Sequence, residues 1–226
     1  MKAFDLAPSD LESEPKKTAQ KIALWADQLR HLSAMGLHFS KNPYDRANYE
    51  QIQEIAMRMM ALATAQSLED VRALSAVTFR RPTPLVTGDA AIIDDDGRIL
   101  LIRRSDNGKW AMPGGAMEVG ETAAEGVVRE ALEETGVQCE VLALVGVHDS
   151  RRIGAETAHH LYMLSFLCRP ICGMDLQNEP STAVEILDRR WFAEADLPPN
   201  LDPGHATRIP HAFRVWGDNA RAGYDE

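Results

Sequence analysis

Nowhere does this 226-residue chain have a run of apolar residues approaching the ~20 that a membrane-spanning helix needs. Its first residues are acidic and polar, so they lack the basic end and apolar centre of a secretory signal. The cysteines, Cys139, Cys168 and Cys172, are odd in number and include no zinc-like double pair, so we interpret them as reduced structural thiols. These absences predict a globular cytoplasmic protein with no membrane partner.

Basic residues are also fewer than acidic ones. The chain has 24 Lys and Arg against 34 Asp and Glu, which gives a formal net charge of −10. Binding to a nucleic-acid backbone depends on clustered Lys and Arg, so nucleic acid is not an expected partner. A small phosphorylated substrate stays compatible, because a divalent cation bound with it supplies positive charge.

The first third of the chain shows helical periodicity. Residues 1–17 are predicted to be a flexible tail, and residues 18–79 a small helical domain. Apolar residues repeat at helical spacing up to Gly36, where we expect a helix to end, then from Tyr49 to Ala63, and a third helix is expected from Ser67. Two or three helices bury little apolar surface by themselves, so their apolar face must pack against another surface. That surface is either a second copy of the chain or the rest of the same chain, and a homodimer is the assembly that we expect. That face includes Met57, Met59 and Met60.

A proline-rich connector separates this region from a main domain predicted at residues 84–218, with a polar tail at 219–226. The apolar segments LVTGDAAII and RILLIRR flank Asp94–Gly97, which predicts a β-hairpin. Its three aspartates suit a turn better than a metal site. Further strands are expected at 139–147, 161–168 and 183–191, and a last helix after Pro203. Strands on both sides of a central helix predict an α/β sandwich.

That central helix carries an acidic face. Thr122 and Glu125 have the spacing of a capping box, and Gly136 suits a left-handed helix end. Between them, carboxylates at positions i, i+3 and i+4 project from one face. Such carboxylates repel one another unless a cation neutralises them, and hard oxygen ligands favour Mg²⁺ or Mn²⁺. The alternative is a solvated acidic surface. The carboxylates are those of Glu130, Glu133 and Glu134.

The stretch from Gly115 to Val137, GAMEVGETAAEGVVREALEETGV, fits the pattern G-x5-E-x7-R-E-U-x-E-E-x-G-U, where U is apolar, at every fixed position. It resembles the Nudix box. The resemblance implies a Nudix α/β/α sandwich with a mixed sheet and metal-dependent hydrolysis of the pyrophosphate bond in a nucleoside diphosphate derivative. The N-terminal segment from Trp25 to Ala63 is similar to the helical extension of a Nudix subgroup that acts on ADP-ribose or CDP-choline.

The resemblance also implies roles for the residues of the box. Glu130 and Glu134 are expected to be the principal metal ligands, and Glu133 a ligand or the general base. Arg129 is expected to hold the carboxylate of Glu121 and so to orient the cluster. The backbone carbonyl of Gly115 is a further expected ligand.

Residues outside the box are assigned to substrate binding with open alternatives. Trp110 either stacks on the substrate or belongs to the core. Arg151 and Arg152 either hold a second phosphate or form ordinary surface. Glu185 is either a distal glutamate of the site or a solvent-facing strand residue. Candidate bases beyond the carboxylates are His148, His159 and His160, for which ordinary surface is the alternative.

Two other functions remain open at this stage. A nucleoside triphosphate sanitising enzyme would use the same metal chemistry and release inorganic pyrophosphate. A non-catalytic, nucleotide-sensing Nudix module would tolerate lost carboxylates and would need a DNA-binding segment. The complete box and the acidic composition both favour the enzyme.

Overall fold

The computed structural model describes residues 14–78, 84–157, 160–172, 176, 181, 184–218 and 220–225. The chain divides into two compact units, Met1–Pro82 and Thr83–Glu226. Among the helices in the described ranges, none is both long and apolar enough to cross a membrane.

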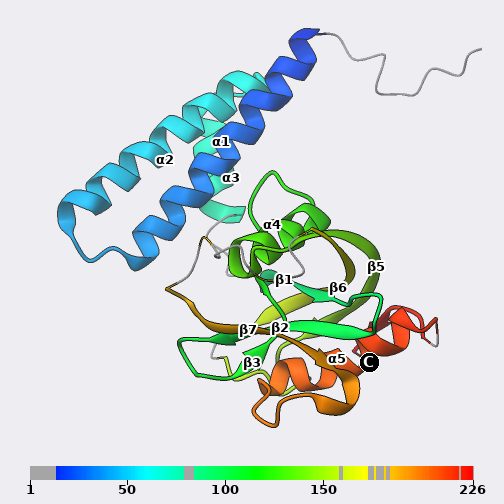
Figure 1. Ribbon diagram of the computed structural model, residues 1–226. Coiled ribbons are helices and arrows are strands. Elements are labelled where there is room, and N and C mark those ends of the chain that lie inside the picture. Colours follow the sequence, from blue (N-terminus) through cyan, green and yellow to red (C-terminus); the bar gives the residue numbers. More distant parts are fainter. Residues whose placement is uncertain are drawn as a thin grey trace, which may run out of the picture. The chain divides into compact units, whose positions relative to one another are not determined.

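The described part of the first unit consists of three helices, α1 (Glu14–Phe39), α2 (Pro43–Thr64) and α3 (Leu68–Thr78) (Figure 1). Helix α2 begins where Asn42 accepts a hydrogen bond from the N–H of Tyr44, and Pro43 occupies its first turn. The predicted tail was too long, because α1 already begins at Glu14; residues 1–13 lie outside the described ranges.

We expected the first helix to end at Gly36, but Gly36 lies inside α1. A Cβ atom at this position would overlap the aromatic ring of Tyr49 on α2. The glycine therefore lets two helices approach closely, and this packing role outweighs its low helix propensity. The helix ends at Phe39, shortly before Pro43.

The described residues of the second unit form two sheets (Figure 1). In the larger, β1 (Leu85–Ile92) pairs antiparallel with β4 (Gly114–Ala116) and parallel with β6 (Leu161–Cys172). Strand β5 (Gln138–Asp149) pairs antiparallel with β6 and parallel with β8 (Gly223–Tyr224). The smaller sheet has the order β3 (Trp110–Ala111), β2 (Arg98–Arg104), β7 (Ile186–Ala193).

Two helices pack on opposite sides of these strands, α4 (Ala123–Thr135) and α5 (Pro203–Trp216). The alternation at the end of β1 shows this directly. Ala90 and Ile92 contribute to the core cluster with α4, whereas Ala91 and Ile93, the residue just after β1, contribute to the cluster with α5. The predicted α/β/α sandwich with a mixed sheet is confirmed, and so is the preceding helical region.

The predicted hairpin is only partly right. The turn at Asp94–Gly97 is present, and buried Asp94 accepts hydrogen bonds from the backbone N–H groups of Asp96 and Arg98. However, β1 and β2 belong to different sheets and meet at one bridge, between Ile93 and Ile99. The two strands separate because each is buried against other partners. The carboxylate of Asp94 thus stabilises the turn.

The other expected elements differ mainly at their ends. Strands β5 and β6 are longer than predicted, and β7 begins at Ile186, so Glu185 lies in the turn before it. The final helix after Asp202 is confirmed. The predicted polar tail is wrong in its described part, because β8 joins the sheet and Asp225 accepts a hydrogen bond from the N–H of Asp149. Cys139, Cys168 and Cys172 are free thiols.

Candidate active site

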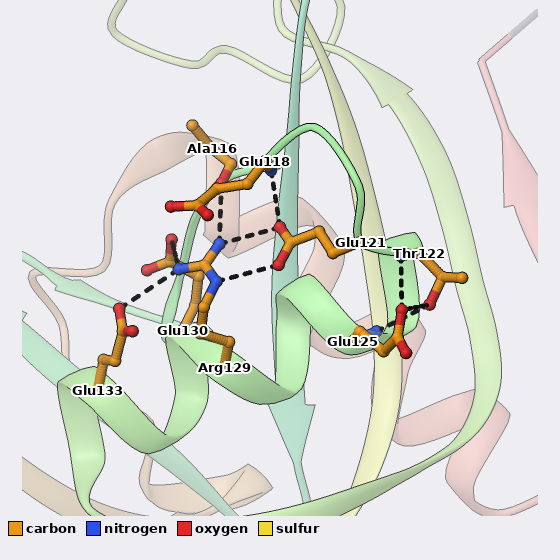
Figure 2. A network of polar contacts seen from close by, with 8 residues as sticks. All are labelled: Ala116, Glu118, Glu121, Thr122, Glu125, Arg129, Glu130 and Glu133. Atoms are coloured by element: carbon orange, nitrogen blue, oxygen red, sulfur yellow. Dashed lines mark hydrogen bonds and ion pairs between the residues drawn. The ribbon is translucent and has the colours of Figure 1, made fainter. Parts of the chain in front are cut away.

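Helix α4 forms for the local reasons that its sequence indicates. Thr122 accepts the N–H of Glu125, and the carboxylate of Glu125 accepts the N–H of Thr122, which completes a capping box (Figure 2). Gly136 ends the helix in a left-handed conformation. The buried face, with Val127 and Ala131, packs on the sheet, and Glu134 is buried near the end of the same helix.

Arg129 organises the acidic groups of this helix and of the loop before it (Figure 2). Its Nε and Nη2 atoms donate to the two carboxylate oxygens of Glu121, each at 3.0 Å. Its Nη1 atom donates to Glu130 at 2.8 Å and more weakly to Glu133 at 3.3 Å. The side chain therefore makes the bidentate contact with Glu121 that the resemblance implied, and it also orients Glu130.

The cavity beside this cluster has a volume of about 500 Å³. Glu130 and Glu134 from α4 line it together with the backbone of the glycine turn, which includes Gly115. Glu185 comes from the turn before β7 and also lines the cavity, although it is far from the box in the chain. The structure thus brings four predicted site residues into one cavity.

Burial disfavours the charged form of the carboxylates of Glu130 and Glu134 and so raises the pKa of each. The pKa of Glu134 is raised to about 7, mainly because the group is buried; nearby Glu130 raises it further, whereas the N–H of Gly114 lowers it. That N–H donates to the Glu134 carboxylate at 2.7 Å. Burial also raises the pKa of Glu130, against the opposing effect of Arg129. A bound cation would stabilise the charged form of both carboxylates and so lower their pKa values.

The donor set fits a divalent metal ion. Glu130 and Glu134 supply hard oxygen atoms, and a Cβ atom at Gly115 would approach the carboxylate of Glu130 to 2.6 Å, so a larger residue here would displace that carboxylate. Within the described ranges, however, no group of three acidic, His or Cys side chains is already arranged around a metal position. Glu133 contacts Arg129 and is not among the side chains that line the cavity.

Other predicted site residues lie away from the cavity. The side chain of Trp110 is only 6% exposed and contacts Phe192 edge to face within the core, so its ring has no open face for a substrate. This burial favours the core alternative for Trp110. Arg151 is exposed and paired with Asp149, and neither it nor exposed Arg152 lines the cavity.

The two histidine candidates that the structure describes do not line the cavity either. His148 is buried near Asp225, and burial lowers its pKa. His160 contacts Asp149 at 3.2 Å, and neither imidazole lines the cavity. His159 lies outside the described ranges.

One basic side chain that we had not predicted does line the cavity. Arg104, at the end of β2, makes a bidentate contact with Asp106, at 3.0 and 2.7 Å. Its positive charge lowers the pKa of Glu134. The sequence signal was a pair of arginines that ends an apolar strand just before a turn, but nothing in the local pattern shows which side of the sheet each one faces.

Comparisons with known families agree with this geometry. The model described as the NUDIX domain matches residues 84–212. A second model, described as a UDP-X-like, N-terminal oligomerisation domain, matches residues 20–75.

Individual relatives cover both units or mainly the second. Bacillus subtilis (strain 168) YjhB, named provisionally as an ADP-ribose pyrophosphatase, is 32% identical over 183 residues, which are 80% of this chain and 85% of that protein. The ADP-ribose pyrophosphatase of Methanocaldococcus jannaschii is 50% identical over 108 residues, 46% of this chain and 62% of that protein. The crystal structure of a UDP-X diphosphatase has a TM-score of 0.59 at 28% identity and covers 92% of this chain and 99% of its own.

The fold, the complete acidic motif and the matched domain lead to one conclusion. Nudix hydrolases generally use divalent metal ions, usually Mg²⁺, and the cavity offers the oxygen ligands that such ions prefer. This chain belongs to the Nudix family and is a Nudix pyrophosphatase with an N-terminal helical region of the UDP-X-like type.

Proposed function

We propose that this enzyme hydrolyses the pyrophosphate bond of a nucleoside diphosphate derivative, with ADP-ribose as the substrate that the relatives favour. The observation that carries the proposal is the buried carboxylate of Glu134 and the partly buried carboxylate of Glu130, which line one cavity beside the glycine turn. Relatives named as ADP-ribose pyrophosphatases support the substrate class. The UDP-X diphosphatase extends the range to UDP-linked compounds.

Glu130, Glu134 and the carbonyl of Gly115 are the groups that we propose to hold Mg²⁺, or Mn²⁺ in its place, with Glu133 as a further ligand or base. A bound divalent cation supplies charge neutralisation at the phosphates and lowers the pKa of water. The protein holds these groups in place through Arg129, which fixes Glu121 and Glu130 at once. Water adds across the P–O–P bridge, and each product keeps one phosphate.

Two residues near the carboxylates are proposed to contact the substrate. Arg104 is the basic side chain that lines the cavity in the described ranges, and its guanidinium is suited to a phosphate oxygen. Glu185, in the turn before β7, also lines the cavity and is proposed as the distal glutamate. Arg151 and Arg152 keep a proposed role only if the substrate extends beyond the cavity.

The substrate proposal is tested by product masses. Purified enzyme with Mg²⁺ is incubated with ADP-ribose, a UDP-linked sugar, CDP-choline and a nucleoside triphosphate. We expect AMP and ribose 5-phosphate from ADP-ribose, at the highest kcat/KM of the panel. Preferred release of inorganic pyrophosphate from the triphosphate would instead establish the sanitising function, and binding without any product would establish the sensing module.

We also propose that the helical unit forms a homodimer, in line with the oligomerisation domain that it resembles. Leu62 on α2 is 82% exposed and Leu32 on α1 is 62% exposed, and a contact between subunits would remove such apolar side chains from water. Light scattering is expected to show a dimer for the wild type and a monomer for Leu62→Glu. Glu50→Gln, a change at another exposed position on α2, is the control. A monomeric wild type would contradict the proposal.

A further inference from the structure

Behind the glycine turn lies a buried polar network that the Nudix box does not include. It joins Asp89 on β1, Ser165 on β6, and His205 and Arg208 on α5, and all four side chains are buried. These residues are far apart in the sequence. Buried polar groups are costly unless they are satisfied, so a network of this kind fixes the relative positions of the elements that it joins.

Arg208 and Asp89 form the charged centre of this network. The Nη1 atom of Arg208 donates to the carboxylate of Asp89, and also to the hydroxyl of Ser165 at 2.9 Å. Its Nε atom donates to the carbonyl of Gly204, one turn earlier in α5. The charge pair thereby fastens α5 to the edge of the sheet where β1 meets β4.

His205 connects this centre to the segment that leads into the active site. The backbone N–H of Met112 donates to its Nδ1 atom at 3.2 Å. Because Nδ1 accepts, the neutral ring carries its proton on Nε2, which faces Asp89 with 3.7 Å between Nε2 and the carboxylate oxygen. Burial and the charge of Arg208 lower the pKa of His205 to about 4, which agrees with a neutral ring.

Met112 stands just before the glycine turn. The carbonyl of Pro113 accepts the N–H of Ala90 at 2.9 Å, and Gly114 pairs with Asp89 across β4 and β1. The N–H of Gly114 then donates to Glu134 at 2.7 Å. Hydrogen bonds therefore hold the backbone from Met112 to Gly114, which contacts the carboxylate of Glu134, at successive residues. The first of these hydrogen bonds is the one from Met112 to His205.

We propose that His205 is a positioning residue that holds the Met112–Gly115 backbone against Glu134. Asp89 lies 3.7 Å from the Nε2 atom of this ring, and Arg208 holds Asp89 in place, so both support its position. The catalytic consequence of this inference rests on the proposed function, but the structural contact does not. Outer groups that hold a ligand in place typically change metal affinity or activity by ~10- to 100-fold when they are replaced.

The test uses two variants of nearly equal shape. Asn in His205→Asn keeps an acceptor at the δ position, whereas Leu in His205→Leu has none. His211→Leu is the matched control, because His211 lies on the same helix but contacts the carbonyl of Arg221 instead. Amide hydrogen exchange of Met112 and Gly114 is measured by NMR in the metal-free, full-length protein, alongside kcat and KM with Mg²⁺.

For His205→Leu we expect the Met112 and Gly114 amides to exchange roughly tenfold faster or more, because a buried hydrogen bond is lost. We also expect kcat to fall at least ~10-fold with KM nearly unchanged. His205→Asn should restore both, and His211→Leu should change neither. Wild-type exchange of both amides in folded His205→Leu would overturn the proposal.

If His205→Leu does not fold, His205→Asn decides the question by itself. Protected Met112 and Gly114 amides in that variant support the positioning role, and unprotected amides with an intact core overturn it. If the wild type proves inactive on every nucleotide tested, the proposed function fails, and the exchange rates still decide whether His205 holds this backbone.

Discussion

Glu134→Gln is expected to reduce kcat at least ~100-fold at saturating Mg²⁺, the scale of losing a positioned catalytic group. The change removes one negative charge from the cavity and nearly preserves the shape of the side chain. Glu134 is 9% exposed and accepts the N–H of Gly114, a contact that the amide oxygen of Gln can keep, so the loss of kcat reports on the missing charge. Steady-state kinetics on the preferred substrate measures the effect.

A control for Glu134→Gln is Glu118→Gln, which removes an exposed carboxylate from the loop before the same helix. This control should keep wild-type kcat. Circular dichroism should show the same helix content for both variants, because neither alters the capping box of Thr122 and Glu125. Turnover of Glu134→Gln within threefold of wild type would contradict the assignment of the site.

Asp89→Ala is expected to lower the free energy of unfolding of the second unit by about 3–5 kcal/mol. The substitution leaves the guanidinium of Arg208 as an unpaired charge, with that side chain fully buried. Hydrogen exchange of buried β1 amides measures the loss, because it reports on the opening of this unit alone.

The double variant Asp89→Ala/Arg208→Met tests the reason for that loss. It removes both charges, so we expect it to be more stable than Asp89→Ala alone. Equal stability of the single variant and the wild type would show that the pair contributes nothing to the fold.

The local features of α4 could be predicted from the sequence because they depend on short spacings. The capping box, the left-handed end at Gly136 and the acidic face all follow from residues a few positions apart. The contact between Arg129 and Glu121 was available from the family resemblance, and the structure shows it as a bidentate pair. These features form the core of the candidate site.

What the sequence did not predict depends on contacts between distant segments. Arg104 reaches the cavity only because β2 pairs with β7, and no local pattern indicates that pairing. For the same reason the sequence left both alternatives for Glu185 open. The network of His205 and Arg208 likewise depends on where α5 packs. Trp110 shows the same limit, since its position before the glycine turn was compatible with both a core role and a substrate contact.

The wrong expectations have related causes. Gly36 was interpreted as a helix end because glycine is a weak helix former, but its missing side chain accommodates Tyr49. The segments on either side of Asp94–Gly97 have the pattern of a hairpin, yet each strand finds a different sheet. The polar end of the chain contributes β8 through backbone hydrogen bonds, which composition does not reveal.

The most direct test of the central claim measures the binding of Mn²⁺ to the metal-free protein. Electron paramagnetic resonance in the absence of nucleotide reports the bound fraction. The buried carboxylates predict a site in the wild type that tightens as pH rises through about 7, where Glu134 loses its proton. Glu134→Gln should weaken this binding by ~10-fold or more. Equal Mn²⁺ affinity of the two proteins at pH 8 would contradict the claim that this cavity holds the metal ion.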